Sequence, residues 1–103
     1  MAHIPSKQFV KAVKECRQNK GDSWQYSQKF GRGWELQICG VNTWYLFHYD
    51  TLILVCNESA KVCRPFYGYS ASDRDGINSL TRILFGKCVA YISCGELFVD
   101  GVE

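Results

Sequence analysis

The sequence lacks any long hydrophobic run, and none of its apolar stretches approaches the roughly 18–20 residues that a bilayer-spanning helix needs. Residues 1–6 contain no apolar core of the kind that marks a secretory signal peptide. Linkers, internal repeats and low-complexity segments are missing as well. We therefore expect an intracellular protein that forms one domain.

Closely spaced metal ligands are also missing. There are six cysteines, but the tightest spacings, Cys88 to Cys94 and Cys56 to Cys63, leave five and six intervening residues instead of the two of a zinc-binding pair. Only two histidines could assist them. We therefore predict no metal site and no cofactor. In a reducing compartment, we expect most of the cysteines to pack as small hydrophobic residues.

Catalytic motifs are absent too: there is no Gly-x-Ser-x-Gly elbow, no phosphate-binding loop and no His-Glu-x-x-His. Asp73 and Asp75 stand two residues apart in an expected helix, so their carboxylates should point in different directions and not share a substrate. His48 is a lone histidine in an expected strand, where such a residue is more often structural than catalytic. We therefore predict a protein that is not an enzyme.

What the sequence does contain is typical of an ordered globular domain. Of its 103 residues, 47% are apolar and 15% aromatic, enough for one dense core with aromatics left over for a protein-binding face. The charge is uneven. Residues 1–34 carry seven basic and two acidic side chains, a net +5, whereas residues 35–103 carry five basic and eight acidic ones, a net −3. The basic part could meet an acidic partner, or it could simply be a solvated helix face.

The N-terminal residues predict a helix. Ser6 is a natural N-cap, Phe9, Val13 and Cys16 recur at helical spacing, and Gly21 is a natural stop. The face away from the apolar stripe carries a row of basic residues: Lys7, Lys11 and Lys14.

Five strand-like segments follow, at residues 23–30, 34–40, 43–49, 51–56 and 61–69. The first two flank a Gly-Arg-Gly turn and predict a hairpin. Apolar and polar residues alternate in the second segment, which predicts one buried face. The third and fourth segments are too apolar for an edge, so we expect them at the centre of the sheet. The fifth contains Pro65, which predicts an edge strand or a strand that ends there.

The stretch SASDRDG predicts the start of a second helix at about 71–86. Ser70 or Ser72 can cap this helix, and the residues from Ser72 to Asp75 resemble a capping box with Asp in place of Glu. Two carboxylates in the first turn would also suit the helix dipole. Apolar residues follow at helical spacing, and Gly86 ends the element.

The tail, residues 88–101, predicts a hairpin that turns near Cys94 and Gly95. The chain as a whole therefore predicts an α+β fold. Its order is an N-terminal helix, a five-stranded and mostly antiparallel sheet, a second helix and a C-terminal hairpin.

A pattern within residues 45–86 carries a family resemblance. A Tyr-x-Thr strand leads through a short turn to a strand that ends in Tyr-Ser, then to a polar helix start and an amphipathic helix. The positions are Tyr49, Asp50, Thr51, Tyr69, Ser70, Asp73, Arg74, Ile77 and Asn78. In this arrangement the segment resembles a family of small, mostly uncharacterised bacteriophage proteins. It departs from them at His48, where the family usually has Ser, and at the helix start, where Thr-x-x-His is common.

The resemblance implies a phage or prophage origin, a small α+β domain and action in the cytoplasm of an infected bacterium. Phages encode many compact proteins that inactivate host machinery by binding it. Our first hypothesis is therefore an inhibitor of bacterial immunity, namely an anti-CRISPR protein that binds a Cas effector nuclease. The candidate contacts are a charged patch and aromatic anchors: Asp50, Glu58, Asp73, Arg74, Asp75, Tyr67 and Tyr69. Taken one at a time, these carboxylates are more often only caps or turn residues.

Two alternatives stay open. In a nucleotide-signal sponge, Tyr67 and Tyr69 would stack on the base while Arg64 and Arg74 bound phosphate. In a nucleic-acid-binding protein, the basic helix face and the turn at residues 29–34 would contact the phosphates. The residues of this basic face are Lys7, Lys11, Lys14 and Arg32.

Overall fold

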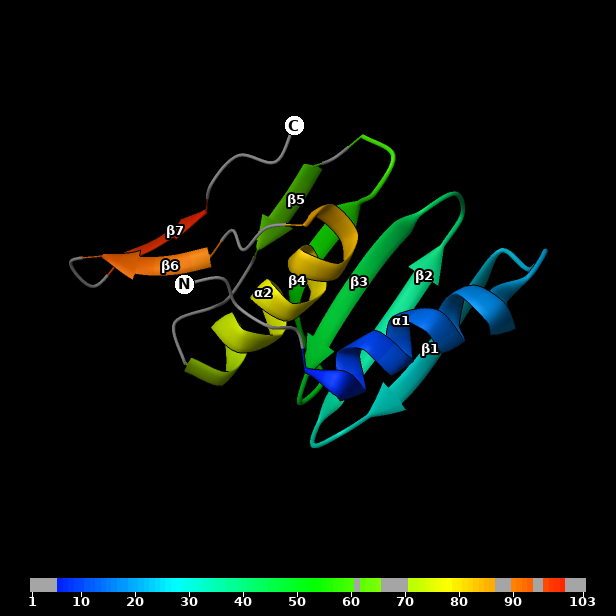
Figure 1. The fold of residues 1–103 in the computed structure, drawn as a ribbon, viewed down its shortest axis with the longest axis horizontal. Helices are drawn as coiled ribbons and strands as arrows, with labels where there is room; N and C mark the ends of the chain where they lie inside the picture. Colours follow the sequence, from blue (N-terminus) through cyan, green and yellow to red (C-terminus); the bar gives the residue numbers. More distant parts are fainter. Residues whose placement is uncertain (1–5, 61, 66–70, 87–89, 94–95, 100–103) are drawn as a thin grey trace.

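The computed structural model describes residues 6–60, 62–65, 71–86, 90–93 and 96–99. The elements follow in the order α1 (Lys7–Lys20), β1 (Gln25–Phe30), β2 (Trp34–Cys39), β3 (Thr43–His48), β4 (Thr51–Asn57), β5 (Val62–Pro65), α2 (Ala71–Phe85), β6 (Ala90–Ser93) and β7 (Glu96–Val99). This arrangement confirms the α+β class and the predicted order of helix, sheet and helix (Figure 1).

The main sheet has the strand order β1-β2-β3-β4-β5, and each neighbouring pair is antiparallel. The two most apolar strands, β3 and β4, are central, as their composition predicts. The strand β5 is at the edge and ends at Pro65, in agreement with the lack of a backbone donor there. A separate hairpin, β6–β7, closes the chain by pairing Ser93 with Glu96, and the residues of its turn lie outside the described ones.

Both helices cover the same face of the sheet (Figure 1). The core forms between them and the inward side chains of β2, β3 and β4, and its largest fully buried residue is Trp44. In β2 the burial alternates strictly, with Trp34, Leu36 and Ile38 inside. Helix α1 contributes the predicted stripe, and its expected N-cap, Ser6, accepts a hydrogen bond from the Phe9 N–H at 3.4 Å.

A β-bulge at Ile53 adapts β4 to the core. Leu46 pairs with Leu54, but the next residue of β3, Phe47, pairs with Leu52, so Ile53 has no partner in the ladder. Ile53 and Leu54 are both buried as a result. Beyond the bulge, Leu52 returns to the sheet face that the helices leave uncovered.

Two local predictions are wrong. Helix α2 begins at Ala71 and already contains Ser72, so the helix starts before Ser72; the other expected cap, Ser70, lies outside the described residues. The third strand was expected to include Tyr49, but β3 ends at His48 and Tyr49 belongs to the turn. In the described part of the chain, no helix has the length and apolar character to cross a membrane.

Candidate functional site

One end of the main sheet gathers three segments, α1, β3 and α2, around Trp34, the first residue of β2, and we call it the Trp34 end. The indole is buried and meets Phe9 of α1 edge-on at 5.0 Å between ring centroids. The imidazole of His48 stacks on it at 3.8 Å, with only 7° between the planes. Helix α2 approaches through Gly76, where a Cβ atom would overlap the indole. This end is therefore held by close ring packing.

His48 also connects β3 to the first turn of α2. Its Nδ1 lies 2.7 Å from Oδ1 of Asp73, and the two side chains are only 10% and 20% exposed. Asp73 is in the first helical turn, as expected, whereas Asp75, which was expected in the same turn, lies beyond it. The link of Asp73 to a residue 25 positions earlier was not predicted. Among the described residues, the imidazole of His48 has no other hydrogen-bond partner, so it is not linked to a serine or cysteine nucleophile.

The turn between β3 and β4 exposes an aromatic ring on a strained backbone. Tyr49 and Asp50 both have positive φ, 49° and 64°, between the paired residues His48 and Thr51. This is the pattern of a type I′ turn, which normally uses Asn-Gly or Asp-Gly because bulky residues avoid this region. Even so, the position is occupied by Tyr49, a residue that is 61% exposed.

Neighbouring residues fix the orientation of Tyr49. Its N–H donates to the carbonyl of Gly33 at 2.7 Å, and its ring lies 4.4 Å from the imidazole of His48. The ring also covers Gly33, where a Cβ atom would overlap it. Tyr49 is thus an exposed side chain with a defined position.

Two hollows of about 290 Å³ each flank Trp34. One lies between the first turns of the two helices and includes Gln8 and Asp75. The other lies between the β1–β2 and β3–β4 turns and includes Lys29, Tyr49 and Asp50.

Most of the predicted contact residues that the structure describes lie at this end. Asp50 and Asp75 line the hollows, Asp73 holds His48, and Arg74 is in the same helical turn as the two α2 carboxylates. The predicted anchors Tyr67 and Tyr69 lie outside the described residues. The sequence predicts Tyr49 only as part of a strand. A two-residue gap between two apolar strands is the sequence signal that could have placed it in a turn.

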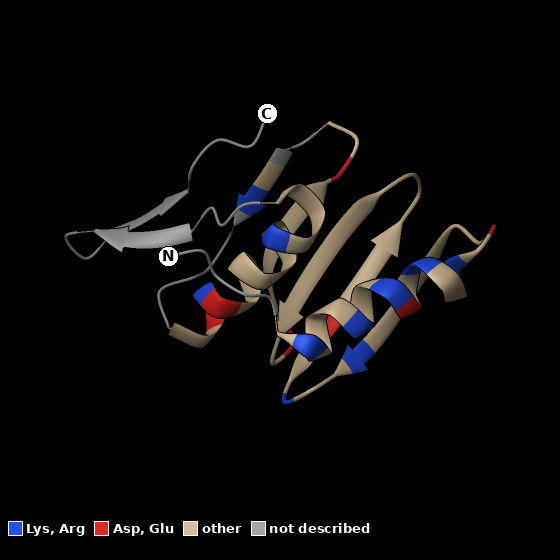
Figure 2. Ribbon diagram, in the orientation of Figure 1, with Lys and Arg blue, Asp and Glu red and all other residues tan. Residues whose placement is uncertain are grey.

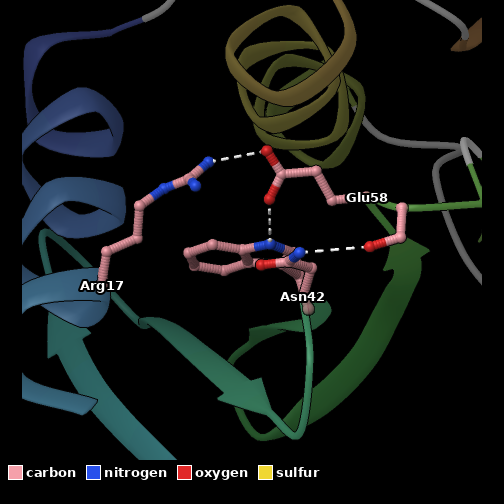
Figure 3. Close-up of polar contacts among 5 residues, drawn as sticks. Arg17, Asn42 and Glu58 are labelled. Carbon is pink, nitrogen blue, oxygen red and sulfur yellow. Dashed lines mark hydrogen bonds and ion pairs between the residues drawn. The ribbon is translucent and has the colours of Figure 1, made fainter. Parts of the chain in front are cut away.

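Glu58 does not belong to this group. It follows β4, whereas Asp50 precedes that strand, so the two lie at opposite ends of it. Figure 3 shows that Glu58 accepts hydrogen bonds from Arg17 at 2.9 Å and from Nε1 of the buried Trp44 at 3.2 Å. Beside it, Asn42 donates to Ser59 at 3.1 Å. Glu58 therefore has a structural role, and the predicted patch that included it is wrong.

The predicted basic face lies on the outside of α1. Lys7, Lys11 and Lys14 are exposed, and Arg32 lies in the β1–β2 turn. Figure 2 shows positive charges along α1 and at this turn. The cations proposed for a nucleotide do not converge. Arg64 lies on the uncovered face of the sheet, because it pairs with Val55, whereas Arg74 belongs to α2 on the other face.

The described residues contain no group of three or more potential metal ligands. Two thiols are strongly held in the protonated form. Burial, with a smaller contribution from Glu15, raises the pKa of Cys16 to about 11, and its thiol donates to the carbonyl of Leu36 at 3.7 Å. A hydrogen bond with Cys63, which stands opposite in β5, and burial raise the pKa of Cys56. Both thiols are therefore poor nucleophiles.

Comparison with protein-family models, with curated proteins and with solved structures gives no match.

Proposed function

We propose that this protein is a non-enzymatic binding protein that docks on a partner protein through the Trp34 end, with Tyr49 as its anchor. The observation that carries the proposal is an exposed tyrosine in a left-handed backbone conformation. Such a residue is destabilised by about 1 kcal/mol or more relative to glycine or asparagine. The turn itself does not require an aromatic ring, so a role outside the fold accounts for it.

The surroundings of Tyr49 suit an interface anchor. Tyrosine is enriched among residues that dominate binding energy, especially where the ring is presented beside pockets that a partner can fill. The contacts to Gly33 and His48 fix the ring before binding, which reduces the entropy lost on association. Asp50 and Asp75 at the hollows add polar groups around this anchor.

The pair His48 and Asp73 supports this role better than a catalytic one. His48 stacks on the ring of Trp34 and also contacts the ring of Tyr49, and neither hollow includes it in its lining. Its hydrogen bond to Asp73 orients the imidazole on which Tyr49 rests. We therefore interpret the pair as a support for the anchor.

The resemblance of residues 45–86 to small phage proteins suggests the class of partner. We propose a bacterial defence protein in the host cytoplasm, with a Cas effector nuclease as the first candidate. The resemblance bears on the Trp34 end because the resembling segment, residues 45–86, includes Tyr49, Asp50 and Asp73.

The test is affinity capture with the tagged protein from lysates of bacteria that carry active CRISPR and other defence systems, read by mass spectrometry. We expect one stoichiometric partner, which Tyr49→Asn should lose because it removes the ring and keeps a residue that tolerates positive φ. The matched control is Trp24→Ala, which removes a ring that is 75% exposed before β1, at the opposite end of that strand from the Trp34 end.

Retention of the partner by Trp24→Ala and its loss from Tyr49→Asn would support the proposal. Capture that is unaffected by Tyr49→Asn, or lost equally from both variants, would contradict it. Assay of a captured nuclease with and without the protein would then show whether binding inhibits it.

A further inference from the structure

We propose that the uncovered face of the main sheet binds single-stranded nucleic acid. Both helices lie on the other face (Figure 1), and none of the described elements covers this one. The inference concerns a different surface from the Trp34 end and does not rest on the proposed docking function.

The strand registers place the side chains of this face in rows that run across the sheet. One row consists of Lys29, Glu35, Phe47 and Leu52. The next consists of Ser27, Gln37, Tyr45, Val55 and Arg64. Hydrogen bonds confirm that polar residues share the face, since Gln37 donates to Gln25 at 3.3 Å and Asn57 donates to Thr43 at 3.3 Å.

Two aromatic rings lie at the centre of the face. Tyr45 and Phe47 are both partly exposed and stand two residues apart on the central strand β3, so their Cα atoms are about 7 Å apart. An extended single strand can place successive bases on rings spaced in this way, and such stacking tolerates any sequence because every base has a π-face. Amides flank the rings, and amide groups can hydrogen-bond to base edges.

Cations stand on both sides of the rings. Lys29 lies on β1 and Arg64 on β5, both are exposed, and neither has an ion-pair partner among the described residues. This differs from Arg17, which is paired with Glu58. Phosphates on either side of two stacked bases would meet a positive charge at each edge of the sheet.

A protein partner would fit this face less well. The centre of a protein interface is depleted in charge, whereas here Glu35 stands directly beside Phe47 and amides adjoin Tyr45. Glu35 opposes phosphate binding, so weak and salt-sensitive affinity is expected. Replacing Glu35 by the neutral Gln should therefore raise the affinity for single-stranded nucleic acid.

The experiment measures fluorescence anisotropy of labelled oligothymidylate and oligouridylate, each about 12 nucleotides long, with a duplex of the same length as control. We expect both single strands to bind and the duplex to bind more weakly. With two phosphates neutralised, the logarithm of the binding constant should fall with the logarithm of salt concentration with a slope of about −1.4. A preference for one single strand would support the proposal and identify the source as DNA or RNA.

The variants assign the binding to this face. Tyr45→Leu and Phe47→Leu keep an apolar side chain but remove the ring, and each should weaken binding at least about fivefold. The double variant Lys29→Ala/Arg64→Ala should flatten the salt slope. Its matched control, Lys11→Ala/Lys14→Ala, removes two charges from α1. In this variant, binding should still depend on the rings of Tyr45 and Phe47 and should keep the salt slope of wild type. Glu35→Gln should bind more tightly than wild type.

The proposal would be overturned by no binding of either single strand at low salt, by equal binding of the duplex, or by binding that Tyr45→Leu and Phe47→Leu leave unchanged. If Lys11→Ala/Lys14→Ala weakened oligonucleotide binding more than Lys29→Ala/Arg64→Ala, the nucleic acid would bind at α1. That result would also overturn the proposal. Tyr49→Asn should leave oligonucleotide binding intact, so this test and the capture experiment can fail separately.

Discussion

At the scale of single residues, Glu58 shows how one carboxylate can hold two elements. One oxygen accepts from the indole N–H of Trp44, whose side chain is fully buried, and the other from Arg17 of α1. The Arg17 side chain is 45% exposed and its carbon Cζ lies 5.4 Å from the Trp44 ring centroid. The indole contact should therefore matter more than the ion pair, because water can replace the partner of an exposed cation.

Replacing Glu58 by Ala should lower the free energy of unfolding by about 1–3 kcal/mol, since it leaves the Trp44 N–H without an acceptor in a buried position. Glu58→Gln keeps an acceptor, so its effect should be clearly smaller. Arg17→Ala should change stability by no more than about 1 kcal/mol. Urea unfolding followed by tryptophan fluorescence measures all three, and an effect of Arg17→Ala as large as that of Glu58→Ala would contradict this assignment.

The buried thiol of Cys16 makes stability depend on alkaline pH. Its pKa is about 11 in the fold against 9.0 for an unperturbed thiol, so between these values the unfolded chain has lost the proton while the folded chain keeps it. Stability is therefore unaffected below pH 9 and falls as pH rises through the window from about 9 to 11. The Cys16 contribution to this loss should be about 1 kcal/mol between pH 8 and 10.

Denaturation at the two pH values in wild type and in Cys16→Ala isolates this contribution. The variant should start from a lower stability and lose less of it on going to the higher pH. An identical loss in both proteins would show that the Cys16 thiol is not responsible.

At the scale of elements, the packing of α2 on β2 depends on a single glycine. Alanine normally stabilises a helix interior by up to about 1 kcal/mol relative to glycine. At Gly76, however, a methyl group would overlap the ring of Trp34, which is itself fixed between Phe9 and His48. Overpacking of this kind typically destabilises by about 1–3 kcal/mol, so we expect Gly76→Ala to be destabilising despite the helix propensity.

A double-mutant cycle tests the contact. Gly76→Ala should be less harmful in a Trp34→Phe background, where a smaller ring leaves room for the methyl group. Additive effects of the two substitutions on the free energy of unfolding would exclude a direct clash.

At the scale of the whole molecule, much of the fold could be predicted because local signals agreed with it. The apolar stripe of α1 with its Ser6 cap, the alternation in β2 and Pro65 at the edge each depend on residues close together in the sequence. The boundary errors arose where local signals compete. Ser72 resembles a cap, and Tyr49 has a strong preference for strands, but the register of β3 against β4 places it in the turn.

The candidate site was less predictable because it depends on contacts between distant residues. Asp50, Asp73 and Asp75 lie at the Trp34 end, but the ring contacts of His48 with Trp34 and Tyr49 join separate segments of the chain. A periodic pattern of apolar residues in the sequence does not predict ring contacts of this kind. Glu58 was assigned to the same patch because it is close in sequence, whereas a full strand separates it from Asp50.

The most direct test of the central claim compares stability and partner capture in the variant Tyr49→Asn. If Tyr49 serves binding and not folding, the variant should lose the captured partner while its free energy of unfolding stays within about 1 kcal/mol of wild type, since relief of backbone strain offsets the lost ring contacts. A strongly destabilised variant, or a stable one that still captures the partner, would contradict the account.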